Sequence, residues 1–493
     1  MITYNLENRG NKPLYQFLYE CLRNDIIEGR IASGSKLPSK RTFARNLGVG
    51  VNTVTTAYEQ LVAEGFVYAE EKRGYFAAHV EAMSAPAVSK PNPLPLAVDD
   101  DSTCFMDFRA NRVNLGNFPE DAWRRCLRKA ILDGGESLYQ TIPYAGLPKL
   151  RNAIADYLYA NRGLSVDPAR IIVGAGTEYL IRRLFDLFGN DVAFGIESTG
   201  FKKLAAHAER FHARAVIVPP TWSRIEPNLD DKRRANENVR GARCVIADEG
   251  LNLDVLRNSN AKVMYVSPAN RFPSGRIMPI NTRVSLLNWA YERPDRFIVE
   301  DDYDSEFRYS GRAILPLYAE DTHDRVIYLN TFSKTMVPSL RISYMILPKV
   351  LMQRYEETLS FYSCSASSLE QYALADFIES GTFERHINKL RAFYGRQRTT
   401  ILNQLNASPL MNIADIEAHR SGTHFLLRVR TEWPKEEISR RGNRLGLRIS
   451  FFSDYSMSDI DRPGEVTLVM NYAAIAPNQV TEVVARLNRL FLG

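Results

Sequence analysis

Hydrophobic and polar positions divide the chain into three zones. Before residue 80, apolar residues recur at helical spacing, and the zone ends in two short strand-like runs. Residues 81–103 carry four prolines, small residues and an acidic run, and they follow neither period. After residue 103, strand-like apolar runs alternate with amphipathic helical ones. The pattern therefore predicts a helical domain over 11–80, a linker over 81–103 and an α/β domain over 104–493.

The strand-like runs of the third zone define its expected sheet. Strands that are apolar at nearly every position are buried on both faces, as in a parallel sheet covered by helices on both sides. The charged stretch 222–241 interrupts two such runs, so we expect an exposed loop insertion there. The expected strands lie in RIIVGAG, DVAFGIE, ARAVIVP, AKVMYVSP, RFIVEDDYD and RVIYLNTFSK.

The first zone predicts three helices followed by a hairpin. Ser39 is placed to cap the second helix, because its hydroxyl accepts a backbone N–H, and Gly48 can end that helix because glycine tolerates positive φ. This order of elements is that of a winged helix-turn-helix. The expected helices cover 14–28, 41–47 and 52–64, and the expected strands cover 66–69 and 74–78, joined by the charged tip EEKR.

This zone resembles the DNA-binding domain of the GntR family through GSKLPSKR, NTV, AYxxLxxEG and the wing glycine Gly74. The resemblance implies double-stranded operator DNA as a partner, because Asn can read adenine edges and Arg can contact phosphate or guanine. Gly50 and Val51 stand where many members carry Ser-Arg, which removes one usual base contact. The implied DNA contacts are Ser39, Lys40, Arg41, Asn52, Thr53 and Thr55, with Lys72 or Arg73 at the wing.

Charge and cysteine content exclude few functional classes. Residues 1–80 hold ten Lys and Arg against eight Asp and Glu, so a domain that only contacts protein stays an alternative. The whole chain has a formal charge of +6 and five scattered cysteines without a CxxC pair. These cysteines indicate reduced thiols, not disulfides or a metal site. Without a signal-peptide pattern or ~18 successive apolar residues, we expect a cytoplasmic protein that does not span a membrane.

Four segments of the third zone carry residues suited to one cofactor chemistry: VGAGTE (173–178), SPANRFPSG (267–275), FIVEDDYD (297–304) and YLNTFSKTMVPSLRIS (328–343). A lysine that attacks an aldehyde must be neutral, and a protonated pyridine nitrogen needs a carboxylate. A phosphate needs backbone N–H groups at a helix start, hydroxyls and an arginine. Each segment alone is also compatible with ordinary packing or a solvated loop, so the argument depends on their joint order.

In this order the segments resemble the fold-type I, aspartate aminotransferase-like proteins, which bind pyridoxal 5′-phosphate (PLP). With the first zone attached, the chain resembles the MocR subgroup of GntR regulators, and EDDYDSEF and TFSK…LRISY match its GabR-like members. The resemblance covers nearly the whole chain outside the linker. It implies a mostly parallel sheet with helices on both faces, a small C-terminal α+β subdomain and a homodimer.

The resemblance also implies a role for individual residues. Lys334 would form the internal aldimine with PLP, Asp301 would pair with the pyridine nitrogen, and Tyr303 would contact the phenolic oxygen of the ring. Phe201 matches the aromatic residue that stacks on the ring, and Asn270 is a further polar contact. The phosphate would be held by backbone donors of Gly176, Thr177 and Glu178 and by the side chains of Thr177, Thr331, Ser333 and Arg341.

Two departures from the GabR-like pattern concern the effector. Ala474 stands where we expect the arginine that takes a substrate carboxylate, and Lys203 replaces a second pocket arginine. A lysine lacks the planar two-pronged geometry of a guanidinium. We therefore expect GABA-like amino acids to bind poorly, and a decarboxylated amine, a different amino acid or PLP itself to be the effector.

The sequence leaves three functions open. We expect a transcriptional regulator, not an enzyme, which senses its effector through amine exchange at Lys334. The main alternative is an active aminotransferase with an appended DNA-binding domain, and partial transamination is compatible with either. The third is a DNA-binding architectural protein with a relic cofactor domain.

Overall fold

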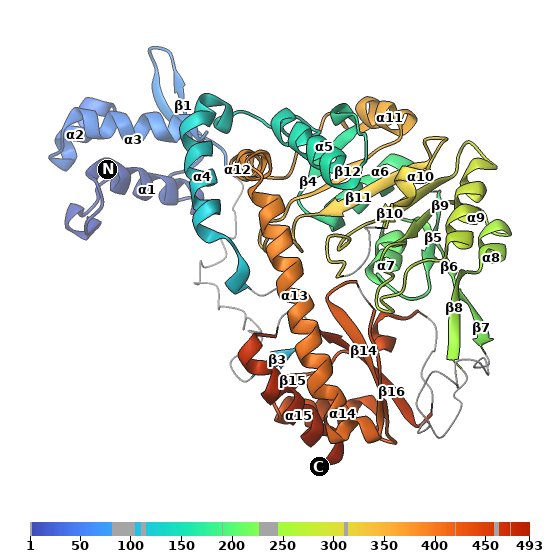
Figure 1. The fold of residues 1–493 in the computed structure, drawn as a ribbon. Coiled ribbons are helices and arrows are strands. Elements are labelled where there is room, and N and C mark those ends of the chain that lie inside the picture. The colour runs from blue at the N-terminus through green and yellow to red at the C-terminus, as the bar shows by residue number, and fades with distance from the viewer. Residues whose placement is uncertain are drawn as a thin grey trace. The chain divides into compact units, whose positions relative to one another are not determined.

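The computed structural model describes residues 2–80, 104–109, 115–189, 191–225, 245–309, 314–419, 421–457, 463–473 and 475–493. The chain forms two compact units, Met1–Asp99 and Asp100–Gly493 (Figure 1). The expected linker 81–103 and Ala474 lie outside the described residues. Within the described ranges, no helix combines the length and the apolar character needed to cross a membrane.

The first unit has the predicted helix-turn-helix and hairpin. The Ser39 hydroxyl accepts the Thr42 N–H at 3.2 Å, and Gly48 ends α2 with φ of 66°, so both predicted signals are confirmed. Leu22, Val54 and Leu61 belong to a buried core that α1 and α3 share. The elements are α1 (Leu14–Ile27), α2 (Lys40–Leu47), α3 (Val51–Ala63), β1 (Val67–Glu70) and β2 (Gly74–Ala77).

The second unit is built on a seven-stranded sheet of order β4-β12-β11-β10-β9-β5-β6. All six predicted strands are present, and β10 runs parallel to β9 and β11, as β5 does to β6 and β9. The expected mostly parallel sheet is confirmed, but β12 was not predicted and runs antiparallel between β11 and β4. The strands are β4 (Ile171–Gly174), β5 (Ala193–Glu197), β6 (Arg214–Val218), β9 (Ala261–Val266), β10 (Phe297–Asp301), β11 (Val326–Thr331) and β12 (Ser343–Ile346).

Helices cover both faces of this sheet, as predicted. The core on one face joins the sheet to α6, α7 and α11. The cores on the other face join it to α5 and α12 at the β4 end and to α8 and α9 beyond β10. The helices are α4 (Glu120–Gly134), α5 (Pro148–Arg162), α6 (Thr177–Phe188), α7 (Lys203–Arg210), α8 (Leu253–Arg257), α9 (Ile280–Tyr291), α10 (Leu317–Glu320), α11 (Lys349–Leu359) and α12 (Ser368–Glu379).

A smaller α+β subdomain follows, which confirms that prediction. The 25-residue helix α13 (Thr382–Asn406) runs from the helical layer of the large sheet to the subdomain (Figure 1). There an antiparallel sheet of order β13-β14-β16 packs its apolar side chains with α15. The remaining elements are β3 (Met106–Asp107), β13 (Ala414–Glu417), β14 (His424–Arg430), α14 (Lys435–Arg444), β15 (Leu447–Arg448), β16 (Glu465–Asn471) and α15 (Val480–Leu492).

The predicted loop insertion at 222–241 is wrong at its start. Residues 222–225 belong to β7 (Pro220–Ile225), which pairs antiparallel with β8 (Val245–Leu251) in a separate two-stranded sheet. The backbone there is satisfied by strand pairing, a contact that the charged local sequence does not reveal. Residues 226–241 lie outside the described residues.

Candidate functional site

A cavity of about 620 Å³ lies where the parallel strands of the large sheet end. Its wall includes Glu197 and Asp301, the last residues of β5 and β10, and Thr331, the last residue of β11. Ligands of open α/β sheets bind at this edge, because loops there are free to vary while the strands hold them. The predicted residues that line the cavity are Thr177, Glu178, Phe201, Lys203, Asp301, Tyr303, Thr331, Ser333, Lys334 and Arg341.

Lys334 follows β11 by three residues and is held over a ring. Its Nζ lies 5.7 Å from the centroid of the Tyr303 ring. Burial lowers the pKa of the Lys334 amine below its usual value, and the charges of Asp304 and Asp301 only partly oppose this shift. A larger share of neutral amine follows, and the neutral form is the nucleophile toward a carbonyl carbon.

Asp301 ends β10 and faces the same cavity. The Tyr265 hydroxyl, from the neighbouring strand β9, donates a hydrogen bond to Asp301 Oδ2. Burial raises the pKa of Asp301 to about 7, while the Tyr265 hydrogen bond and the charge of Lys334 lower it. The other oxygen, Oδ1, is buried and has no hydrogen-bond partner among the described residues. A buried acceptor of this kind needs a donor, and a protonated ring nitrogen is one that fits.

The start of α6 carries the kinds of group that a phosphate requires. Thr177 opens this helix, where backbone N–H groups have no partner within the helix. Its hydroxyl lies 3.4 Å from Ser343 Oγ, which donates to Thr331 Oγ1 at 2.8 Å. The guanidinium of Arg341 lies against Gly176, whose φ is +95°. N–H groups, hydroxyls and a guanidinium thus surround one end of the cavity.

We predict that Gly176→Ala weakens the binding of PLP about tenfold but leaves the affinity for pyridoxal, which lacks the phosphate, nearly unchanged. A Cβ at Gly176 would lie 2.4 Å from Arg341 Nη2, so the guanidinium must move, and the positive φ adds about 1–3 kcal/mol of strain. Equilibrium titration with both compounds measures the difference.

The matched control is Gly189→Ala, which imposes the same kind of backbone strain at a residue that does not line the cavity. Gly189 has φ of +86° at the C-terminal end of α6, and a Cβ there meets no atom within 4 Å. An equal loss of PLP affinity in both variants would show that strain alone, and not the position of Arg341, explains the effect.

Two predicted residues make contacts other than those expected. Asn270 does not line the cavity. Its side-chain amide donates to Asp304 Oδ2 at 2.5 Å, and its backbone carbonyl accepts a hydrogen bond from the Tyr303 hydroxyl at 3.2 Å. Lys203 does line it, but its Nζ lies 2.8 Å from Glu178 Oε1. A carboxylate ligand would therefore compete with Glu178 for this lysine.

Sequence reasoning missed several residues of the cavity. Tyr265 is one, although a hydroxyl in the otherwise apolar run VMYV was a usable signal. The small subdomain contributes a wall that no motif predicted. It includes Phe108, Arg109, Thr423, His424, Asp454, Tyr455, Val469 and Asn471. Burial lowers the pKa of His424 to about 4, so this side chain is neutral. Among the described residues, no cluster of three or more His, Cys, Asp or Glu is placed to hold a metal ion.

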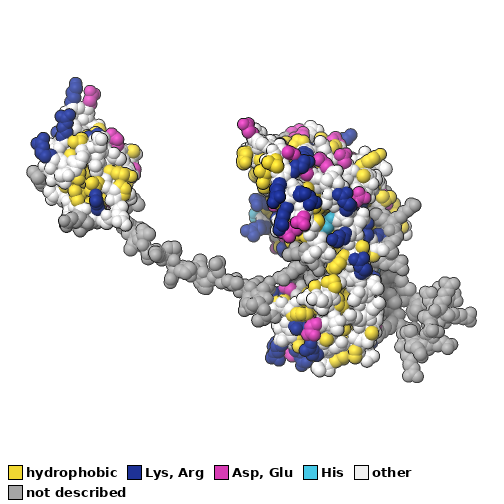
Figure 2. All heavy atoms as spheres, turned by 60° about the vertical axis from the view of Figure 1, so that its left-hand side comes forward, with side chains coloured by type: hydrophobic (Ala, Val, Ile, Leu, Met, Phe, Trp, Pro, Cys, Tyr) yellow, Lys and Arg dark blue, Asp and Glu magenta, His cyan; other side chains and the backbone are white. Residues whose placement is uncertain are grey.

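The predicted DNA contacts of the first unit differ in their exposure to solvent and in whether they already have a partner. Arg41 and Asn52 are exposed on α2 and α3, and Lys72 is exposed at the hairpin tip with φ of 60°. Figure 2 shows Lys and Arg side chains gathered around the protruding hairpin of this unit. The Ser39 hydroxyl is engaged in the cap of α2, and Lys40 Nζ lies 3.7 Å from Glu59 Oε1. Thr53 and Thr55 are half-buried on α3, and Arg73 pairs with Glu70.

Family models match both units of the chain. Residues 14–76 match the bacterial regulatory proteins of the gntR family, and residues 105–436 match aminotransferase class I and II. The HTH-type transcriptional regulator YdeL of Bacillus subtilis is 33% identical over 487 residues, which cover 99% of this chain and 98% of that protein. The probable rhizopine catabolism regulatory protein MocR of Rhizobium meliloti is 30% identical over 504 residues, which cover 99% of this chain and 95% of that protein.

Solved structures share the fold of the second unit. The kynurenine aminotransferase of Pyrococcus horikoshii, solved in complex with PMP, has a TM-score of 0.64 at 21% identity. The match covers 78% of this chain and 90% of that one. The structural likeness includes the large sheet and the small subdomain, whereas the sequence relatives extend through the first unit as well.

Proposed function

Because the chain belongs to the MocR group of GntR-family transcriptional regulators, which join a helix-turn-helix to an aminotransferase-like domain, we propose that it is a PLP-dependent sensor. In this proposal, PLP is attached to Lys334 in the cavity at the end of the large sheet. A small amine that enters the cavity changes the affinity of the first unit for operator DNA. A protein that acts on the bacterial chromosome works in the cytoplasm.

The observation that carries the proposal is the buried, unpartnered Oδ1 of Asp301, which faces the same cavity as the amine of Lys334. Asp301 would hold the pyridine nitrogen, and Arg341 with the start of α6 would hold the phosphate. Tyr303 would contact the phenolic oxygen, and Phe201 would stack on the ring. When bound, PLP supplies an aldehyde carbon for an amine and a ring that withdraws electrons.

The effector that suits this cavity is an amine without a clamped carboxylate. Among the described residues that line the cavity, the cations other than Lys334 and Arg341 already have partners: Arg109 pairs with Asp107, and Lys202 donates to the carbonyl of Ser453. Lys203 is likewise paired with Glu178. A carboxylate ligand would have to displace one of these partners, because a buried carboxylate without a cation is costly. We therefore propose a decarboxylated amine or PLP itself as the signal, and poor binding of GABA-like acids.

The proposal includes a homodimer. Helix-turn-helix dimers read paired half-sites, so two first units per assembly would double the DNA contact. The second unit also leaves large apolar side chains in solvent, among them Leu132 at 81%, Tyr139 at 86% and Phe361 at 74% exposure. Such side chains are typical of surfaces that meet a partner.

Residual transamination is a second candidate, because the lowered pKa of Lys334 suits a nucleophile and the fold is that of aminotransferases. Steady-state formation of product from an amine and a keto acid distinguishes the two functions. A pure sensor exchanges one amine per site and stops, whereas an enzyme continues to turn over.

The decisive experiment measures DNA affinity in four states. Duplexes are first selected for binding by the purified protein, and fluorescence anisotropy then gives the dissociation constant of the PLP-free protein, the PLP-loaded protein, and the loaded protein with an amine or with GABA. We expect PLP or an amine to change this constant by about 5–150-fold, the usual range of coupling between two sites. Equal constants in all four states would refute the sensor function.

A further inference from the structure

A cluster of buried acids lies directly behind the cavity. The segment from Glu300 to Glu306 carries five carboxyl groups, and four of them are buried while Asp301 is half-buried. Asp301 and Asp304 line the cavity, but Asp302 does not. Asp302 instead points into the protein, where its side chain is 1% exposed. An isolated carboxylate at such a position is unstable, so its partners decide its charge.

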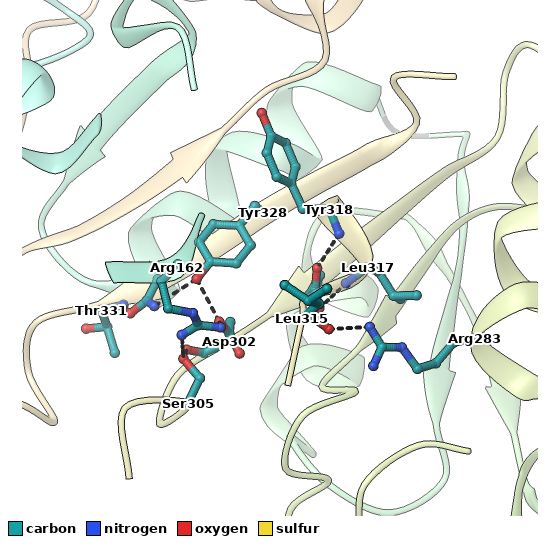
Figure 3. A network of polar contacts seen from close by, with 11 residues as sticks. Arg162, Arg283, Asp302, Ser305, Leu315, Leu317, Tyr318, Tyr328 and Thr331 are labelled. Carbon is teal, nitrogen blue, oxygen red and sulfur yellow. Dashed lines mark hydrogen bonds and ion pairs between the residues drawn. The ribbon is translucent and has the colours of Figure 1, made fainter. Parts of the chain in front are cut away.

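The partner of Asp302 is Arg162, the last residue of α5. Arg162 Nη2 donates to Asp302 Oδ2 at 2.8 Å, and the arginine side chain is 7% exposed. Its Nη1 donates to Ser305 Oγ, and the Tyr328 hydroxyl donates to Asp302 Oδ2 at 2.7 Å. Figure 3 shows these groups converging between α5 and the end of β10. One helix end is thereby linked to the strand that carries Asp301.

Local structure fixes the guanidinium at this place. Gly163 ends α5 in the left-handed conformation, with φ of 67°, so the helix stops directly after Arg162. The end of a helix favours a cation, because its carbonyl groups carry partial negative charge. Burial raises the pKa of Glu306, and the charge of Arg162 partly opposes this rise. Asn330 extends the network, because its amide donates to the Tyr328 hydroxyl at 3.2 Å.

The neighbouring acids influence each other through their charges. Burial is the main cause of the raised pKa of Asp301, and the charge of Asp302 raises it further, whereas Tyr265 and Lys334 lower it. Burial also raises the pKa of Glu300, and the charge of Asp302 adds to that rise; the Glu300 carboxylate accepts the backbone N–H groups of Leu317 and Tyr318 at 2.8 Å each. A cation bound to Asp302 offsets this repulsion, since opposite charges within about 4–6 Å compensate strongly in a buried site.

We propose that Arg162 is a positioning residue for the cofactor: by neutralising the charge of Asp302, it keeps Asp301 ionised beneath the pyridine nitrogen. The inference rests on the proposed binding of PLP, but it assigns a task to a residue that lies outside the cavity. Arg162 does not line the cavity, and its influence on Asp301 passes through its contact with Asp302.

The test compares four proteins: wild type, Arg162→Gln, Asp302→Asn and the double variant. The dissociation constant of PLP is measured from about pH 5 to 9 by absorbance titration, with circular dichroism as the check of folding. Protonation of Asp301 weakens PLP binding, so the affinity decreases as the pH falls below the pKa of Asp301. This decrease is the acidic limb of the plot of affinity against pH. Arg162→Gln leaves the charge of Asp302 unopposed, which raises the pKa of Asp301 and moves this limb to higher pH. Asp302→Asn moves it to lower pH.

We expect Arg162→Gln to weaken PLP binding about fivefold at pH 7. Because the pKa of Asp301 is about 7, a rise of one unit lowers the ionised fraction of its carboxyl from about one half to about one eleventh. The double variant removes both charges, so its acidic limb and its affinity should return to within about threefold of wild type. If Arg162→Gln does not fold, a folded double variant with near wild-type affinity still supports the proposal.

Two results would overturn it. A limb at the wild-type pH in Arg162→Gln would show that Arg162 has no influence on Asp301. A double variant as weak as Arg162→Gln, or weaker, would show a purely structural role in packing. If wild type itself binds no PLP, the proposed function fails, and this failure is distinct because it affects all four proteins alike.

Discussion

Replacing Lys334 with alanine is expected to abolish the covalent attachment of PLP, from one cofactor per chain to none. The amine lies in the cavity and over the Tyr303 ring, and burial lowers its pKa, so it is the nucleophile that the site offers. Borohydride reduction of the PLP-treated protein, followed by measurement of the intact mass, detects the attachment. Visible absorbance of the unreduced protein gives an independent reading.

The control for this variant is Lys389→Ala. Lys389 is exposed on α13 and represents the many surface lysines that react slowly with any aldehyde. We expect it to retain full attachment with the wild-type spectrum. Attachment that persists in Lys334→Ala, or that is lost equally in both variants, would remove Lys334 from its proposed role. DNA binding by PLP-free Lys334→Ala should equal that of PLP-free wild type, because the first unit folds around its own core.

Local patterns were sufficient for most of the fold, and their failures have a common cause. Six strands were predicted because each is apolar at nearly every position, which follows from burial on both faces. Strand β12 was missed because it has four residues, begins with a serine and exists only through pairing with β11 and β4. Residues 222–225 were taken for a loop because their pairing partners in β8 lie twenty or more residues away. Pairing between distant segments leaves little trace in local composition.

The candidate site could also be predicted only in part. Acids at the end of a buried strand predicted a site at that edge of the sheet, and the structure places Asp301 and Tyr303 in the wall of a cavity there. The sequence could not show that Asp302 turns away from it toward Arg162, which precedes it by 140 residues. It also could not show that Lys203 pairs with Glu178, because a lysine and a glutamate are equally common on any surface. Which charges neutralise each other is decided by tertiary packing.

Two exposed residues of the first unit should affect DNA binding in different ways. Asn52, at the start of α3, is placed to read a base edge, so Asn52→Ala should cost about 1–3 kcal/mol on the selected duplex and little on random DNA. Arg41, in the first turn of α2, is placed to contact phosphate. Arg41→Ala should therefore weaken binding to both duplexes and reduce the salt dependence by about one unit of slope. Anisotropy titrations at several salt concentrations measure both quantities.

Two further variants serve as controls for the difference between base contacts and phosphate contacts. Gln60→Ala removes an exposed amide two turns further along α3 and should leave both affinities unchanged. Ser39→Ala removes the cap of α2, so it should lower the free energy of unfolding by about 1 kcal/mol, with a loss of binding only as far as the helix frays.

Equal losses on selected and random DNA for Asn52→Ala would show that this residue contacts the DNA backbone. Base contacts would then have to come from another part of α3, where Thr53 and Thr55 are the half-buried candidates.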